Sequence, residues 1–167
     1  MADKKKISVR FYRFKNKLKE KTAGLGGDEN VEISPEALAE AEAALADMSE
    51  DYPDWVSGTI DKLSEQHRNC VENADKRKEY FQEIREIAHD MKGQGGTFGY
   101  PLISAFSDGL YGFADSRGKL TDDHVEIIKA HVDAMRAVIS NRVKGDGGEI
   151  GAELTKGLEM AIAKYKV

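Results

Sequence analysis

Ala88-His89-Asp90-Met91-Lys92-Gly93-Gln94-Gly95-Gly96-Thr97-Phe98-Gly99 is the stretch that decides the predicted fold. Each residue of an α-helix turns about 100°, so the side chains of this region fall on two faces. The face within about 60° of His89 holds Arg85, Lys92, Gly93 and Gly96. The opposite face is apolar and holds Tyr80, Ile84, Ile87, Met91 and Phe98. The pattern predicts a helix that buries one face in a core and presents a histidine with two cations on the other.

Three glycines, Gly93, Gly95 and Gly96, follow the histidine within two turns. Each costs a helix about 1 kcal/mol relative to alanine, so a sequence that needed only a helix would avoid them. Glycine one turn after His89 leaves the imidazole uncovered and lets another backbone approach. The alternative is that the glycines simply end the helix before Tyr100-Pro101.

His89, Lys92, Gly93 and Gly99 stand at the spacing His-x-x-Lys-Gly-x-x-x-x-x-Gly, with the apolar Phe98 before the last glycine. This stretch resembles the motif of histidine-containing phosphotransfer (HPt) domains, and the chain resembles the stand-alone bacterial type. The resemblance covers about residues 51–143. The sequence departs from the motif at Gln94 and Gly95, where small hydroxyl residues are common in the family, and at Met91, where leucine is common.

The resemblance implies a four-helix bundle that acts in phosphorelay signal transduction by two-component systems. In that family, one exposed histidine carries a phosphoryl group between aspartates of receiver domains, which belong to response regulators or hybrid histidine kinases. Carried over, His89 is the phosphoacceptor and Lys92 compensates the phosphoryl charge. Docking of the partner falls to Arg85, Gly93, Gln94 and Gly96.

The chemistry of the residues agrees with a phosphocarrier. Neutral imidazole is available near pH 7 and is nucleophilic. The chain has neither a phosphate-binding Gly-x-x-x-x-Gly-Lys-Ser/Thr loop nor the motif set of protein kinases. We therefore expect a phosphotransfer intermediate that has no ATP-dependent kinase activity of its own and binds neither a metal nor a cofactor.

Charge is unevenly spread along the chain. Residues 1–21 contain nine Lys/Arg and two Asp/Glu, whereas the whole chain has a net charge of −5. The remaining residues are therefore acidic, which argues against nucleic-acid binding. The single cysteine, Cys70, excludes an internal disulfide and is expected in the core. No apolar run approaches the roughly 20 residues of a membrane span, and no secretion signal is evident, so we expect a cytoplasmic location.

Hydrophobic periodicity predicts an all-α fold, an up-down-up-down four-helix bundle with extra flanking helices. Residues 1–30 are interpreted as a basic arm and linker, and residues 31–167 as the helical domain. The core bundle is expected over about 51–143, beginning at Asp51-Tyr52-Pro53. An added helix over about 34–49, capped by Ser34, is expected to pack on the bundle. A second added helix over about 148–166 packs on the bundle or pairs with another chain, although a monomer is expected.

Several alternatives remain open at this stage. The basic arm either attaches loosely to the bundle or docks an acidic partner or a membrane surface. A metal or haem protein would use His67, His89, His124 and His131, but bundle di-metal sites need two Glu-x-x-His motifs and only Glu86/His89 matches. We expect His67 to be structural and His124 and His131 to be solvated. The main alternative function is a binding-only module that docks receiver domains without phosphotransfer.

Overall fold

The computed structural model describes residues 34–115 and 120–165, and every element in these ranges is helical. The elements are α2 (Pro35–Glu72), the short 3-10 helix η1 (Ala74–Lys76), α3 (Arg77–Gln94), α4 (Pro101–Phe113), α5 (Asp122–Ser140) and α6 (Gly148–Tyr165). The predicted all-α class is confirmed. The basic arm lies outside the described residues.

The chain divides into two units, Met1–Leu38 and Ala39–Val167. In the first, the structure describes the beginning of α2, where the Ala37 backbone N–H donates to Ser34 Oγ at 3.1 Å. Ser34 is therefore the N-cap that the sequence predicts. The remainder of the fold belongs to the second unit.

The predicted break between a helix over 34–49 and a new one at Pro53 is wrong, because Pro53 lies inside the continuous helix α2. Proline lacks the N–H that would have bonded the carbonyl four residues earlier, but that is one bond in a long helix. The buried side chains of Tyr52 and Val56 anchor this turn in the core. The expected packing of residues 39–49 is also wrong, since Leu45 is 42% and Met48 58% exposed.

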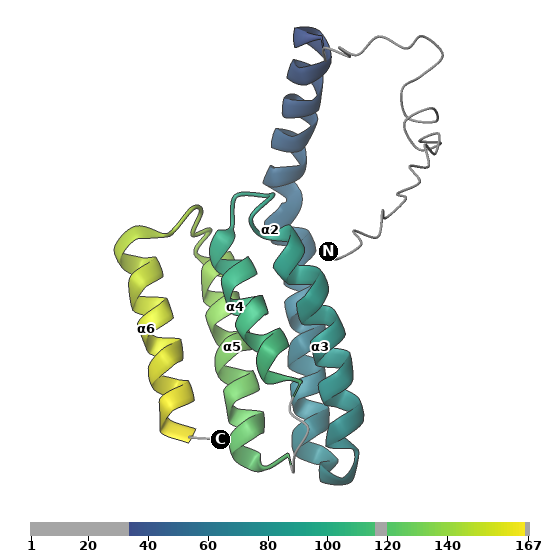
Figure 1. Ribbon diagram of the computed structural model, residues 1–167, viewed down its shortest axis with the longest axis vertical. Helices are drawn as coiled ribbons and strands as arrows, with labels where there is room; N and C mark the ends of the chain where they lie inside the picture. The colour runs from purple at the N-terminus through teal and green to yellow at the C-terminus, as the bar shows by residue number, and fades with distance from the viewer. Residues whose placement is uncertain (1–33, 116–119, 166–167) are drawn as a thin grey trace, which may run out of the picture. The chain divides into compact units, whose positions relative to one another are not determined.

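Buried side chains of α2, α3, α4 and α5 form one apolar core. Figure 1 shows the backbones of α3, α4, α5 and α6 lying side by side. Helix α3 packs against α4, α4 against α5, and α5 against α6. Each helix contributes residues at helical spacing, and the fully buried aliphatic and aromatic side chains include Ile60, Leu63, Ile84, Met91, Tyr100, Ile103, Leu110, Ile128 and Met135. Cys70 is fully buried, as predicted. Of the two alternatives for the last helix, the structure shows packing on its own chain, with Leu158 buried.

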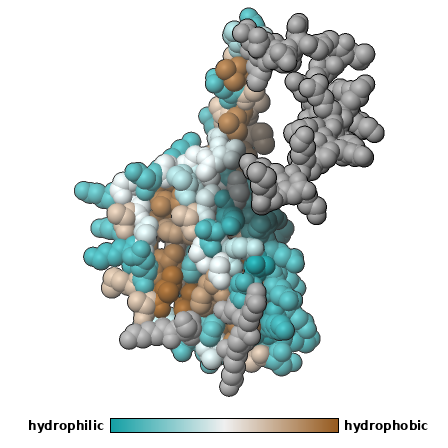
Figure 2. Space-filling model, viewed as in Figure 1, coloured by the Kyte–Doolittle hydropathy of each residue, from teal (hydrophilic) through white to brown (hydrophobic). Residues whose placement is uncertain are grey.

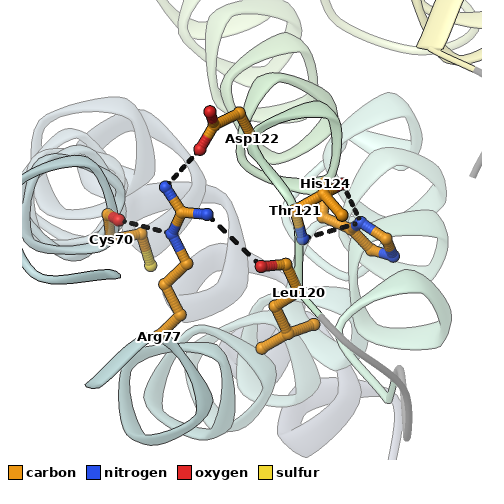
Figure 3. Close-up of polar contacts among 6 residues, drawn as sticks. All are labelled: Cys70, Arg77, Leu120, Thr121, Asp122 and His124. Atoms are coloured by element: carbon orange, nitrogen blue, oxygen red, sulfur yellow. Dashed lines mark hydrogen bonds and ion pairs between the residues drawn. The ribbon is translucent and has the colours of Figure 1, made fainter. Parts of the chain in front are cut away.

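Arg77 joins the ends of three helices (Figure 3). Its Nε donates to the Cys70 carbonyl at 2.8 Å, its Nη1 to the Leu120 carbonyl at 3.3 Å, and its Nη2 to Asp122 Oδ1 at 2.5 Å. The Cys70 carbonyl is one of the last in α2, where helix geometry offers no internal donor. One guanidinium, with its side chain only 11% exposed, thus ties the end of α2 to the starts of α3 and α5.

The start of α5 carries a capping box formed by Thr121 and His124. Thr121 is the N-cap, and its backbone N–H donates to His124 Nδ1 at 3.2 Å (Figure 3). Because Nδ1 accepts this bond, the proton of the neutral imidazole resides on Nε2. His124 is therefore half-buried and structural instead of freely solvated.

The prediction that His131 is solvated is wrong, because this side chain is only 2% exposed. Its Nδ1–H donates to the Ile127 carbonyl at 2.9 Å. Gly109 of α4 makes room for the ring, since a Cβ there would lie 3.1 Å from His131 Nε2. Burial lowers the pKa of His131, and the bond to Ile127 opposes that shift only in part. His67 is half-buried, as expected, and burial lowers its pKa as well.

Replacing Arg77 with alanine should lower the free energy of unfolding by about 3 kcal/mol, because bonds from a charged donor contribute about 1.5–3 kcal/mol each. Urea denaturation measures the loss. The matched control is Arg136→Ala, since Arg136 pairs with Asp61 at 2.9 Å on the exposed surface. Exposed pairs contribute less than about 1 kcal/mol. Equal losses for the two variants would contradict the role assigned to Arg77.

Candidate functional site

Helix α3 presents His89 to solvent. His89 is exposed, whereas Ile84, Ala88 and Met91 of the same helix are buried. The two faces predicted from the helical wheel are therefore present, with Tyr80, Ile87 and Phe98 partly buried at the edge of the apolar face. An exposed imidazole on a helix anchored by its other face is both accessible and held in place.

Tyr111 of α4 lies beside His89 and brings the two neighbouring cations together. The His89 and Tyr111 ring centroids are 5.3 Å apart, with the planes inclined at 46°. Arg85 Cζ lies 4.2 Å and Lys92 Nζ 4.7 Å from the centre of the Tyr111 ring. Both distances are in the range of cation–π attraction. Arg85 Nη2 also donates to the Tyr111 hydroxyl at 2.8 Å.

Two carboxylates balance these cations, Asp108 of α4 and Asp115 of the turn that follows α4. Lys92 Nζ donates to Asp108 Oδ1 at 2.8 Å. Arg85 Nε lies 3.6 Å from Asp115 Oδ1, which is an ion pair but too long for a hydrogen bond. All four side chains are at least one-third exposed, so water screens both pairs. We call this group the Tyr111 cluster; it consists of Arg85, His89, Lys92, Asp108, Tyr111 and Asp115.

Sequence reasoning missed Tyr111, Asp108 and Asp115. Asp108 and Tyr111 lie three residues apart and therefore share one face of α4, and Asp115 follows in the turn after the helix. A usable signal was present in the sequence, because an acidic residue and a tyrosine lie on the polar side of an otherwise apolar helix. The sequence does not show, however, that this face of α4 meets the face of α3 that bears His89.

The other predicted docking residues stand apart from the Tyr111 cluster. Gly93 is exposed within α3, and a Cβ at this position would meet no atom within 4 Å. Gly96 is exposed and its N–H donates to Ser104 Oγ at 2.9 Å. Gln94, at the end of α3, is half-buried. Among the described residues, none of these three makes a hydrogen bond or ring contact with His89.

Gly95 determines how closely the turn after α3 approaches α4. A Cβ at this position would lie 2.7 Å from the Tyr100 carbonyl oxygen and 2.8 Å from the Ser104 nitrogen. The Tyr100 N–H donates to the Gly95 carbonyl at 2.7 Å, which closes the turn. Gly99 then adopts φ +83°, a left-handed conformation that suits glycine. The alternative that the glycines end the helix thus holds for Gly95 and the residues after it, whereas Gly93 lies inside α3.

Replacing Gly95 with alanine should destabilise the protein by about 2–3 kcal/mol, because the new methyl group meets backbone atoms that cannot move aside. Thermal or urea unfolding measures the change. Gly93→Ala is the matched control, two residues earlier and inside α3. It should raise stability by up to about 1 kcal/mol, since alanine favours a helix and the space is open. A harmless Gly95→Ala substitution would show that the close approach is not required.

The described residues contain no group of three or more His, Cys, Asp or Glu side chains placed to hold a metal ion. In residues 34–115 and 120–165, no helix is both long enough and apolar enough to cross a membrane.

The chain was compared with known proteins. It matches no family model, and neither the curated proteins nor the solved structures give a match. The function must therefore be argued from the Tyr111 cluster and the sequence motif.

Proposed function

We propose that the protein is a phosphorelay carrier, in which His89 accepts a phosphoryl group from a receiver-domain aspartate and passes it to another. The observation that carries the proposal is the exposed His89 imidazole on α3, with Lys92 one turn further along the same face. The His-x-x-Lys-Gly spacing and its resemblance to HPt domains support the same reaction. The partners are receiver domains of response regulators or hybrid histidine kinases.

The proposal extends to the arrangement of the chain. Helices α2, α3, α4 and α5 form an up-down-up-down bundle, for which the short connections give support. The protein is a monomeric bacterial phosphocarrier of the cytoplasm, without ATP-dependent kinase activity, cofactor or nucleic-acid partner. Any metal ion needed for transfer is held by the receiver domain.

The transfer step uses the lone pair of the neutral imidazole. One ring nitrogen of His89 attacks the phosphorus of an aspartyl phosphate, so that an N–P bond forms. The P–O bond to the aspartate breaks, and its electron pair leaves with the carboxylate. In the onward step, a second receiver carboxylate attacks the phosphorus, and the N–P electron pair returns to the imidazole. No oxidant or cofactor is needed.

The phosphoryl group brings a charge of about −1.5 to −2 to the surface beside Lys92. In the structure Lys92 is engaged by Asp108 at 2.8 Å. Phosphorylation of His89 therefore offers Lys92 a stronger partner, and Lys92 exchanges Asp108 for the phosphoryl oxygens. Tyr111 keeps the aliphatic and cationic parts of Arg85 and Lys92 near His89 during this exchange.

Phosphotransfer from phosphorylated receiver domains of the same bacterium tests the proposal. The wild-type protein should acquire an acid-labile label, and His89→Ala should acquire none. His67→Gln is the matched control, because His67 lies away from the cluster and should leave labelling unchanged. Unlabelled wild-type protein that still binds the receivers would replace the carrier by the binding-only module.

Replacing Asp108 with asparagine should release Lys92 and lengthen the lifetime of phosphorylated His89 by up to about fivefold, because an exposed ion pair is worth about 0.2–1 kcal/mol. Lys92→Gln should shorten that lifetime by a similar factor. Decay of the labelled protein in buffer gives the rates. The control is the double variant Asp108→Asn/Lys92→Gln, which should decay like Lys92→Gln alone. An equal effect of Asp108→Asn in both backgrounds would show that Asp108 does not act through Lys92.

A further inference from the structure

Helix α2 carries an apolar stripe outside the core. Ala41, Leu45, Met48, Tyr52 and Trp55 alternate at spacings of four and three residues, the spacing of a coiled-coil seam. Tyr52 turns into the core and is 1% exposed, but Leu45, Met48 and Trp55 are 42%, 58% and 53% exposed. Figure 2 shows apolar side chains interrupting the hydrophilic surface along α2. We call Leu45, Met48 and Trp55 the α2 stripe.

The α2 stripe ends in an aromatic hollow. Met48, Asp51, Tyr52 and Trp55 line a cavity of about 300 Å³ together with Phe98, from the turn after α3. The Tyr52 and Phe98 rings stack with centroids 4.8 Å apart, and Trp55 meets Phe98 edge-on at 6.5 Å. Because these rings support one another, the hollow is preformed, and it suits a bulky apolar side chain of a ligand.

The surface around the α2 stripe is acidic. Six exposed carboxylates lie on this part of α2, and three of them, Glu40, Glu42 and Asp51, border the stripe at 100° per residue; the other three are Asp47, Glu50 and Asp54. Residues 39–54 contain no lysine or arginine. In the part of the chain that the structure describes, none of the six has an ion-pair partner. A second copy of α2 would bring like charges together, which disfavours pairing of two identical stripes.

We propose that the α2 stripe and its aromatic hollow bind a basic amphipathic helix of a partner protein. The apolar residues of that helix lie at the same three- and four-residue spacing, and one bulky side chain enters the hollow. Its flanking Lys and Arg side chains face Glu40, Glu42 and Asp51, which border the stripe. The described residues leave the stripe exposed, so a partner helix can reach it. This surface is independent of the phosphoryl chemistry at His89.

Trp55 is the only tryptophan of the chain, so its fluorescence reports directly on occupation of the hollow. The probe is a synthetic helix of three heptads with leucine at the core positions and lysine at the flanking positions. Added to the full-length protein, it should shift Trp55 emission to the blue and reduce quenching by acrylamide. Its affinity should fall at least tenfold between low and high salt, because salt screens the lysine–carboxylate attraction.

Matched variants make the experiment decisive. Leu45→Asp/Met48→Asp should weaken binding at least tenfold, and Ile150→Asp/Met160→Asp on the exposed part of α6 should change it less than twofold. Leu45→Ala/Met48→Ala, which keeps the helix, should weaken it by a smaller factor. Circular dichroism checks that each variant is folded. A peptide with glutamate in place of lysine should not bind.

Three results would overturn the proposal. Equal binding to the stripe and α6 variants would mean that attraction is not localised on α2. If Trp55 is already protected from acrylamide quenching without the peptide, at every protein concentration, a segment of its own chain such as residues 1–21 occupies the stripe. Protection that grows with protein concentration would mean that a second copy occupies it.

Discussion

The missing side chain at Gly95 is the constraint on which the proposed site depends. Without a Cβ, the turn after α3 comes within bonding distance of Tyr100 and the first turn of α4. That approach fixes where α4 begins relative to the end of α3. Antiparallel packing then brings Asp108 next to Lys92, and Tyr111 next to His89 and Arg85. Gly95, where the sequence departs from the family motif, thus has a structural role, whereas the docking role inferred from the resemblance is assigned to Gly93 and Gly96.

Arg77 acts at the other end of the same helix. Its three bonds hold the start of α3 to the end of α2 and to the start of α5. Helix α3 is therefore fixed at both ends, by the partly buried Arg77 guanidinium at one and a close backbone turn at the other. A phosphoryl carrier benefits from such a helix, because the imidazole must stay in position while two partners bind in turn.

Much of the fold could be predicted because apolar periodicity and caps are local. Residue type and spacing predict the helix that bears His89, the last helix over about 148–166, the Ser34 cap and the burial of Cys70. The prediction of a helix break at Pro53 was wrong because proline removes only one hydrogen bond from the helix, and core packing on the same turn compensates for that loss. The prediction that His131 is solvated was wrong because the burial of this ring depends on space left by Gly109, a residue of another helix.

The candidate site, like the fold, could be predicted from the sequence only in part. His89, Lys92 and Arg85 could be found on one helix from the wheel alone. Tyr111, Asp108 and Asp115 required the register between α3 and α4, which no local pattern encodes. That register depends on the Gly95 turn. In the sequence, Gly95 appeared only as a residue that destabilises a helix, with no indication of the backbone it approaches.

The central claim is that the His89 imidazole itself carries the phosphoryl group. Phosphorus NMR of protein labelled with ¹⁵N at histidine, recorded after incubation with a phosphorylated receiver domain, tests it most directly. A single phosphoramidate signal with a one-bond coupling to a ¹⁵N nucleus assigned to His89 is the predicted result. A signal coupled to another histidine, or a phosphoryl group bound to oxygen, would contradict the account.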